Sequence, residues 1–268
     1  MSADEPALVF EGAATDFVTL ASRLWDPLGR ILVQHAAPRR GERVLDACCG
    51  AGASALPAAR AVGSAGRVDA VDLTGPLVEH GRRAARDWPH LRFTRADVMA
   101  WQPLADGPYD LVQSGFGVFF LPDMDAGGKH LVSLLRPDGR FAVQCWRQGA
   151  LAAFARCLFE ATAEETGRSP APPASAEASD RISSPAKLTE WLSSLGLTGV
   201  RVAEVPFLLP LDYELAWLLV TGTAFRALLP GSDESAARRI RDRLLDRISE
   251  LNLTEVDAGS LIGTGTRV

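Results

Sequence analysis

Hydrophobic residues follow two different spacings along most of this chain. Short, almost continuous apolar runs are typical of buried strands, and they occur at residues 43–47, 67–72, 90–94, 109–114 and 140–146. Stretches with apolar residues at helical spacing separate them, at 53–62, 75–86 and 123–135. Strands that alternate with helices of this length indicate βαβ units. The pattern therefore predicts an α/β fold with a parallel, doubly wound sheet.

Helical spacing also marks the two ends of the chain. Between Phe17 and His35 it predicts two short helices that separate at Asp26 and Pro27, with Asp26 as the cap of the second. A helix at 151–166 is followed by the Pro-, Ala- and Ser-rich residues 167–184, which we expect to form a mobile loop. The remaining predicted elements are a helix at 184–196, a strand near 200–207, helices at 212–228 and 233–250, and a last strand near 258–267.

Composition narrows the functional classes. A chain of 268 residues with 47% hydrophobic residues can bury one large core, and its net charge of −5 disfavours a general nucleic-acid-binding surface. The absence of an 18-residue apolar run and the acidic first residues predict no membrane span and no secretory signal. The four cysteines show no metal-ligand spacing, so we expect no metal site and a reducing, cytoplasmic location.

The segment most informative about chemistry follows the first predicted strand. That strand ends in Asp46, and the turn after it contains Gly50 and Gly52 before a predicted helix. Glycines let the backbone approach a ligand where a Cβ would collide. The free N–H groups of the following helix favour a carboxylate or phosphate. This segment therefore predicts a cofactor site.

Two cofactors are compatible with a glycine turn at this place. Residues 50–55 match the dinucleotide pattern G-x-G-x-x-A, and Asp72 supplies the acidic residue after the second strand. Three features favour another cofactor: Asp46 precedes the glycines, a helical segment precedes the sheet, and Asp97 follows the third strand.

With these features, the chain resembles the class I S-adenosylmethionine-dependent methyltransferases, and most of all the small-molecule branch that includes the ubiquinone and menaquinone C-methyltransferases. The matching motifs, in order, are VLDACCGAG at 44–52, AVDL at 70–73, ADV at 96–98, YDLVQSGFG at 109–117, FLPD at 120–123 and LRPDGR at 135–140. The resemblance implies a Rossmann-like sheet of seven strands, mostly parallel, with an antiparallel last strand. It also implies a helical lid segment at 1–42 and a methyltransferase domain at 43–268 with a helical insertion at about 208–252.

The resemblance implies S-adenosylmethionine as cofactor and assigns the residues that bind it. Asp72 would accept hydrogen bonds from both ribose hydroxyls, and Asp97 would accept one from the adenine amino group. Leu73 and the Val98 N–H would contact the adenine ring, and Asp46 would order the loop and the nearby ammonium group. Ser114 and its neighbours would close the methionine side. The full implied set is Asp46, Cys49, Gly50, Ala51, Gly52, Asp72, Leu73, Asp97, Val98, Ser114, Gly115 and Phe116.

No histidine is placed as a catalytic base. His35 lies a few residues before the first strand and His90 begins the third, so both lie at the edge of the sheet opposite the expected cofactor. His80 is on the polar face of its helix, and His130 is late in the helix that leads back to the fifth strand. Positioning alone supplies much of the rate of an in-line methyl transfer, so a base is needed only if the acceptor loses a proton early.

The acceptor site is expected where the N-terminal segment and the insertion cover the carboxyl ends of the strands. Its candidate residues are Trp25, Asp26, Phe116, Phe119, Trp146, Arg147 and Tyr213. Their aromatic character favours a small apolar or aromatic metabolite, with Arg147 as a carboxylate anchor. The sequence SGFG at 114–117 lacks the Asn/Asp-Pro-Pro-Tyr/Phe motif of amide and adenine N-methyltransferases, which disfavours nucleic acid as substrate.

Several alternatives stay open at this stage. The methyl group could go to carbon, oxygen or nitrogen, in bacterial natural-product biosynthesis among other settings. The fold could bind S-adenosylmethionine and catalyse a non-methylating reaction such as cyclisation, or the turn could serve an NAD(P)-dependent oxidoreductase. A monomer and a homodimer are both compatible with the sequence.

Overall fold

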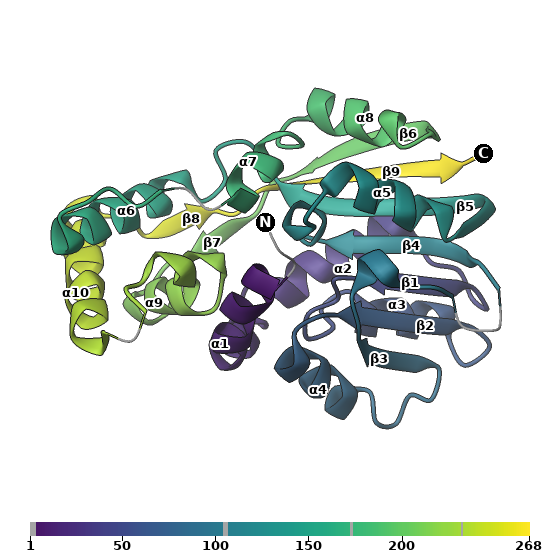
Figure 1. Cartoon of the computed structure of the whole chain (residues 1–268), viewed down its shortest axis with the longest axis horizontal. Helices are drawn as coiled ribbons and strands as arrows, with labels where there is room; N and C mark the ends of the chain where they lie inside the picture. Colours follow the sequence, from purple (N-terminus) through teal and green to yellow (C-terminus); the bar gives the residue numbers. More distant parts are fainter. Residues whose placement is uncertain (1–3, 104–106, 172–173, 232) are drawn as a thin grey trace.

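The computed structural model describes residues 4–103, 107–171, 174–231 and 233–268. Their main sheet has seven strands in the order β3-β2-β1-β4-β5-β9-β6 (Figure 1). The first five of these pair in parallel, whereas β9 is antiparallel to both β5 and β6. The strands are β1 Arg43–Ala47, β2 Arg67–Asp72, β3 Leu91–Arg95, β4 Tyr109–Gly115, β5 Leu135–Trp146, β6 Leu197–Val205 and β9 Ser260–Arg267. The predicted seven-stranded, mostly parallel sheet with an antiparallel last strand is confirmed.

Helices bury both faces of this sheet. The flanking helices are α2 Trp25–Ala36, α3 Ala55–Val62, α4 Gly75–Ala84, α5 Met124–Ser133 and α8 Pro185–Ser194. Along β1, Val44 packs in the cluster under α2, α3 and α4, whereas its neighbour Leu45 packs in the cluster under α5 and α8. A parallel strand that is buried on both faces is a nearly continuous apolar run, which explains why these strands are visible in the sequence.

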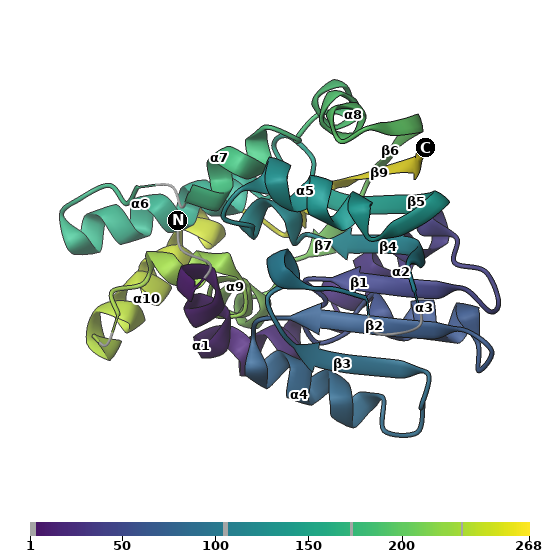
Figure 2. The same ribbon diagram turned by 45° about the vertical axis from the view of Figure 1, so that its right-hand side comes forward.

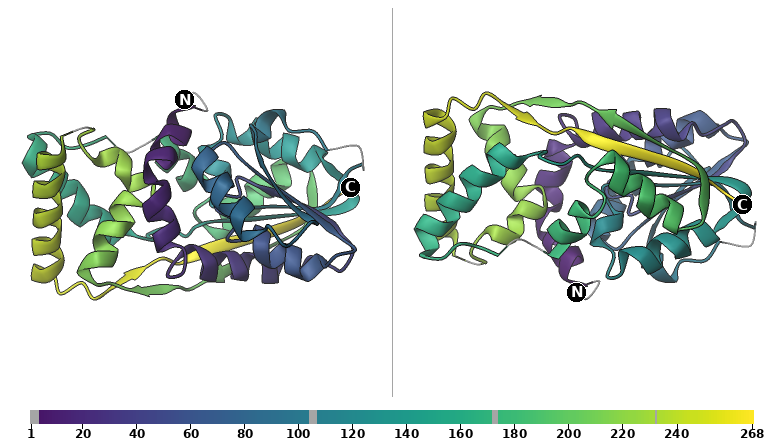
Figure 3. Two further views of the ribbon diagram at one scale, coloured as in Figure 1. Left: turned by 90° about the horizontal axis from the view of Figure 1, so that it is seen from below. Right: turned by 90° about the horizontal axis from the view of Figure 1, so that it is seen from above.

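A separate helical layer lies beyond the carboxyl ends of the parallel strands, on the left of Figure 1. It consists of α6 Ala152–Thr166, α9 Tyr213–Thr221, the 3-10 helix η3 Ala224–Leu228 and α10 Glu234–Glu250. These elements share one apolar cluster with Leu20, Leu24 and Leu28 of the N-terminal segment. The N-terminal helix α1 Asp4–Leu20 lies between α9 and α4 (Figure 3). The layer therefore combines the N-terminal segment with α6 and the predicted insertion.

The structure corrects two predictions in the N-terminal segment. The first helix is not a short one near Phe17, because α1 already begins at Asp4. Asp26 does not cap α2, because the helix begins at Trp25 and its N-cap is Leu24, which makes no side-chain hydrogen bond. Asp26 lies two positions past the N-cap, inside the first turn, where its side chain does not act as the cap. Residues 1–3 of the predicted lid segment lie outside the described residues.

The prediction of a mobile loop at 167–184 is wrong for much of its length. Helix α7 Ala174–Asp180 forms there, whereas residues 172 and 173 lie outside the described residues. It lies beside α5 (Figure 2), and Arg181 after it forms an ion pair with Asp125 of α5 at 2.8 Å. Alanine favours a helix and Ala178 packs on the core, so tertiary contact outweighs the loop-like composition.

Two strand predictions also need correction. Strand β5 begins at Leu135 rather than residue 140, because the sheet continues across a register shift opposite Tyr109 and Leu111. The insertion is framed by a two-stranded antiparallel ribbon that was not predicted, β7 Leu208–Pro210 with β8 Glu255–Asp257. Such three-residue strands are too short to produce a hydrophobic period. No helix in the described residues has the length and apolar character needed to cross a membrane.

Candidate active site

The turn after β1 has a backbone that depends on its glycines. Gly50 and Gly52 have φ values of +53° and +103°, in the region that side chains disfavour. A Cβ on Gly52 would lie 2.7 Å from Cζ of Phe93, and one on Gly50 would lie 3.3 Å from Cζ of Phe17. Cys48 also has a positive φ, of +57°. The turn is therefore packed closely between β3 and the N-terminal segment.

Asp46 supports this turn from below. Its side chain is fully buried and accepts a 2.7 Å hydrogen bond from Oγ of Ser54. Burial raises the pKa of Asp46 to about 7 and Asp72 adds to the rise, while hydrogen bonds from Ser54 and Gln113 oppose it. Because Ser54 bonds Asp46, it does not cap α3, whose first turn has no side-chain cap. The N–H groups there suit a ligand carboxylate.

Two further carboxylates stand at the ends of the next two strands. Asp72 accepts hydrogen bonds of 2.8 Å from the N–H groups of Gly50 and Thr74. Burial is the largest influence on Asp72 and raises its pKa, while these N–H groups oppose the rise. Asp97 follows β3 and accepts a 2.8 Å hydrogen bond from the N–H of Met99. In sheets of this kind, ligands bind at the carboxyl ends of the strands beside the point where the strand order reverses, here between β1 and β4.

A cavity of about 570 Å³ opens on these residues. Among the described residues, the predicted cofactor residues in its wall are Cys49, Gly50, Ala51, Asp72, Leu73, Asp97, Val98, Gly115 and Phe116. Three predicted residues, Asp46, Gly52 and Ser114, are buried and do not form part of this wall. They lie beneath the surface of the site, whereas Gly115 and Phe116, the neighbours of Ser114, line the cavity.

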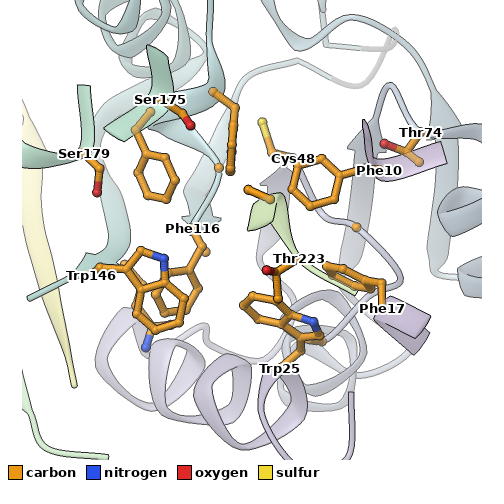
Figure 4. Close-up of a pocket in the computed structure, with 18 of the residues that line it drawn as sticks. Phe10, Phe17, Trp25, Cys48, Thr74, Phe116, Trp146, Ser175, Ser179 and Thr223 are labelled. Carbon is orange, nitrogen blue, oxygen red and sulfur yellow. The ribbon is translucent and has the colours of Figure 1, made fainter. Parts of the chain in front are cut away.

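Aromatic rings form another part of the same wall. Phe116 lies against Trp146 with ring centroids 4.2 Å apart, and Trp25 lies 5.9 Å from Phe116 and 6.2 Å from Trp146 (Figure 4). Phe17 stacks on Trp25 at 5.0 Å. Phe10, Phe119 and Phe120 also line the cavity. Helices α1 and α2, strand β5 and the segment after β4 therefore bring aromatic side chains together, and these include the candidates Trp25, Phe116, Phe119 and Trp146.

The other acceptor-side candidates are placed less favourably. Tyr213 is 55% exposed, because the buried face of α9 is formed by other residues, and neither it nor Asp26 lines the described cavity wall. Arg147 does line the cavity, but its Nη2 forms a 2.5 Å ion pair with Oδ2 of Asp257. Its guanidinium is thus already neutralised, which weakens the prediction of a carboxylate anchor.

Sequence reasoning missed several residues of the wall. Ser175 and Ser179 come from α7, which was predicted to be a loop, and Thr223 comes from the end of the insertion helix (Figure 4). Gln144 lies on β5, where a polar residue in an apolar strand was a usable signal. Cys48 lines the cavity beside the predicted Cys49.

The four histidines lie away from the cavity. His35 and His80 are exposed. Nε2 of His90 is 3.1 Å from the carbonyl oxygen of Ala59, and Nε2 of His130 is 3.0 Å from that of Trp101. Within the described ranges, no group of three His, Cys, Asp or Glu side chains could hold a metal ion, and all four cysteines are free.

Comparison with known proteins agrees with this geometry. Residues 44–139 match the family described as "Methyltransferase domain". Aklanonic acid methyltransferase DauC of Streptomyces is 33% identical over 134 residues, which cover 50% of this chain and 61% of that protein. Demethylmenaquinone methyltransferase of Staphylococcus saprophyticus is 31% identical over 119 residues, 44% and 51% of the two chains. The chain spans about half the length of the curated relatives it matches.

The fold likeness extends over more of the chain than the sequence likeness. The crystal structure of YcgJ protein from Bacillus subtilis has a TM-score of 0.57 and 16% identity, and the match covers 88% of this chain and 96% of that one. The antiparallel strand between β5 and β6 also departs from the dinucleotide-binding strand order 3-2-1-4-5-6. The match over 44–139 shows that this part of the chain is a methyltransferase domain, and the sheet order and the strand-end carboxylates agree with the class I, S-adenosylmethionine-dependent type.

Proposed function

We propose that this protein transfers a methyl group from S-adenosylmethionine to a small apolar or aromatic metabolite. One observation carries the proposal: a single cavity is lined both by Asp72 and Asp97 at the strand ends and by the rings of Trp25, Phe116 and Trp146. A cavity of this size and apolar character is typical of small-molecule sites. The described residues of the wall do not call for a nucleic acid or a protein side chain as the methyl acceptor.

The residues at the strand ends fit the donor. Asp72 and Asp97 provide carboxylate oxygens for the hydroxyl and amino groups of an adenosine, and the uncapped start of α3 provides N–H groups for an amino-acid carboxylate. Buried Asp46 and Asp72 have raised pKa values, so a positively charged ligand relieves an electrostatic cost there. When bound, S-adenosylmethionine supplies an electrophilic methyl group on a sulfonium.

The acceptor part of the wall works by orientation and by exclusion of water. The rings of Trp25, Phe116 and Trp146 offer flat apolar faces that would hold a planar acceptor, and this converts the transfer into an effectively intramolecular step. Outside the donor part, the described residues of the wall include one carboxylate, that of Asp180. Its pKa is lowered by the hydrogen bond to Lys187. It is a poor base. We infer an acceptor that is already nucleophilic or loses its proton to water.

The proposal is tested with a labelled donor. The protein is incubated with methyl-deuterated S-adenosylmethionine and, in separate reactions, with an organic-solvent extract, an aqueous metabolite extract, RNA and protein from a bacterial culture. We expect S-adenosylhomocysteine to form and the label to enter a small molecule of the organic extract. Label in RNA or protein would overturn the acceptor class. Binding of the donor without any label transfer would favour a non-methylating reaction, and binding of NAD in its place would overturn the cofactor.

The pH dependence of that reaction separates the residues further. Replacing each histidine with glutamine should leave the pH–rate profile unchanged, because none of the four side chains reaches the cavity. A limb near neutrality that disappears in one histidine variant would contradict this part of the proposal. A limb that disappears in Asp46→Asn would instead agree with the raised pKa of Asp46.

A further inference from the structure

We propose that Gln144 determines acceptor specificity by accepting a hydrogen bond from a neutral hydroxyl or N–H group of the acceptor. This inference rests on the proposed function, since it concerns the acceptor of the same cavity. The acceptor would then be apolar with one required hydrogen-bond donor, and acceptors without such a donor would be excluded.

The position of Gln144 is fixed on three sides. It lies near the end of β5, where it pairs with Gly115 of β4 and with Ile262 of β9. Its backbone carbonyl oxygen accepts a 2.8 Å hydrogen bond from the backbone N–H of Phe116. Its side-chain Nε2 donates to Oγ of Ser260 at 3.0 Å. Backbone and side chain are therefore both held, as a residue that reads a ligand needs to be.

One atom of this side chain has no partner. The residue has no exposed surface, yet it forms part of the cavity wall, and its Oε1 accepts no hydrogen bond. Buried polar atoms are nearly always hydrogen-bonded, because an unpaired one loses its water without compensation. With Nε2 engaged by Ser260, Oε1 is the free group of the amide, and it requires a donor. A ligand in the cavity is the available source.

The surroundings define the chemistry of that ligand. The rings of Phe116 and Trp146 are the closest ring pair of the wall. The N–H of Phe116 is hydrogen-bonded to the Gln144 backbone, and Trp146 lies two residues after Gln144 on β5. Trp25 contributes a second buried polar atom without a partner, the donor Nε1. A hydroxyl group on an aromatic ring offers a donor to Gln144. A carboxylate offers no donor to Gln144, and Arg147 is already paired with Asp257.

Isothermal titration calorimetry tests this inference on the full chain saturated with S-adenosylhomocysteine. The probes are 1-naphthol, which carries a hydroxyl donor, and 1-methoxynaphthalene, which has the same ring without the donor. We expect 1-naphthol to bind at least about tenfold more tightly, about 1.4 kcal/mol. A site built to hydrogen-bond a hydroxyl rejects analogues that lack it. In Gln144→Met, which keeps the length of the side chain, the preference should fall below about threefold.

A matched control is Thr162→Val. Thr162 lies on α6, its Oγ1 is also buried without a partner, and it does not line the described cavity wall. This variant should keep the full preference for 1-naphthol, so a general effect of removing an unpaired polar atom is separated from recognition. Melting temperatures of both variants confirm that they fold.

Each result decides the matter. An equal affinity of the wild type for both probes, or an undiminished preference in Gln144→Met, would overturn the inference. A preference for 1-acetonaphthone over 1-naphthol that Gln144→Met removes would show the amide acting as a donor, which also overturns it. The readout of this test is binding and not methyl transfer. If the proposed function is wrong, methyl transfer is absent, but the preference for the hydroxyl still tests the role of Gln144.

Discussion

The two parts of the cavity are built in opposite ways. The donor part, formed by Cys49, Gly50, Asp72, Asp97 and their neighbours, comes mostly from residues 48–98 and depends on backbone conformation and buried carboxylates. The acceptor part, formed by Trp25, Phe116, Trp146 and Gln144, draws on segments more than 100 residues apart and depends on side-chain faces. The comparison indicates that a donor common to many proteins needs a defined backbone geometry, which few sequences provide. The acceptor side depends on individual side chains, which differ from one protein to another.

The largest expected effect concerns the electrostatic cost of the donor part. Burial raises the pKa of Asp46 to about 7, from about 3.9 in an unfolded chain. The folded state therefore holds more protons between these values, and the stability of the ligand-free protein falls as the pH rises from about 4 to 7. Asp46→Asn should remove this fall and stabilise the protein at pH 8 by up to about 4 kcal/mol. Urea unfolding at pH 5 and pH 8 measures it, and equal pH slopes for both proteins would refute it.

Asp72 tests whether the donor part binds independently of the acceptor part. Asp72→Ala should lower the affinity for S-adenosylmethionine about 100-fold, because it removes charge-assisted hydrogen bonds to the ligand and two that hold the turn. Calorimetric titration measures this, with the exposed Asp87→Ala as control. The affinity for 1-naphthol should change less than about threefold. A parallel loss of both affinities would show that the two parts are not separable.

Trp146 provides the converse test. Trp146→Ala should lower the affinity for naphthalene probes about 10-fold, since the ring packs at 4.2 Å from Phe116 and its removal opens the apolar wall. Binding of S-adenosylmethionine should stay within about threefold. Trp146→Phe keeps an aromatic face and should retain most of the probe affinity. If the alanine variant instead lost the donor and kept the probe, the assignment of the two parts would be reversed.

The same contrast explains what the sequence allowed us to predict. The strands of the sheet are buried on both faces, so their apolar runs predicted the fold, and the carboxylates Asp72 and Asp97 at strand ends line the cavity. The motifs could not separate the residues that line the cavity from those that support it: Asp46 and Ser114 belong to matching motifs, yet neither lines the described cavity wall. Whether a residue of a motif lines the cavity depends on how it packs in the fold, which the spacing of the motif alone does not encode.

The acceptor part was less predictable for a physical reason. Trp25, Phe116 and Trp146 were found because aromatic residues at segment ends are recognisable, but Tyr213 satisfied the same criterion and is exposed. Helix α7 was missed because its Ala- and Ser-rich sequence is also typical of a loop, while the contacts that bury it come from residues 118–120 and from the core. The short strands β7 and β8 pair with each other, and Leu209 and Val256 pack in the helical cluster. Non-local contacts decide these elements, and a single sequence carries little information about them.

The smallest expected effect concerns how the acceptor part is held together. Nη1 of Arg23, before α2, forms a 2.8 Å ion pair with Oδ2 of Asp212 at the start of the insertion, and both side chains are more than a third exposed. Such a pair contributes about 0.2–1 kcal/mol. A double-mutant cycle with Arg23→Met and Asp212→Asn measures it, because asparagine keeps the cap on the N–H of Leu215 while losing the charge. The coupling energy in urea unfolding should shrink in high salt.

Affinity for 1-naphthol should fall slightly in either variant and affinity for S-adenosylmethionine should not, since the pair joins two segments that both contribute to the acceptor part. A coupling near zero, with unchanged probe binding, would mean that the apolar cluster of Leu20, Leu24 and Leu28 with the insertion holds the acceptor part without help from surface charge.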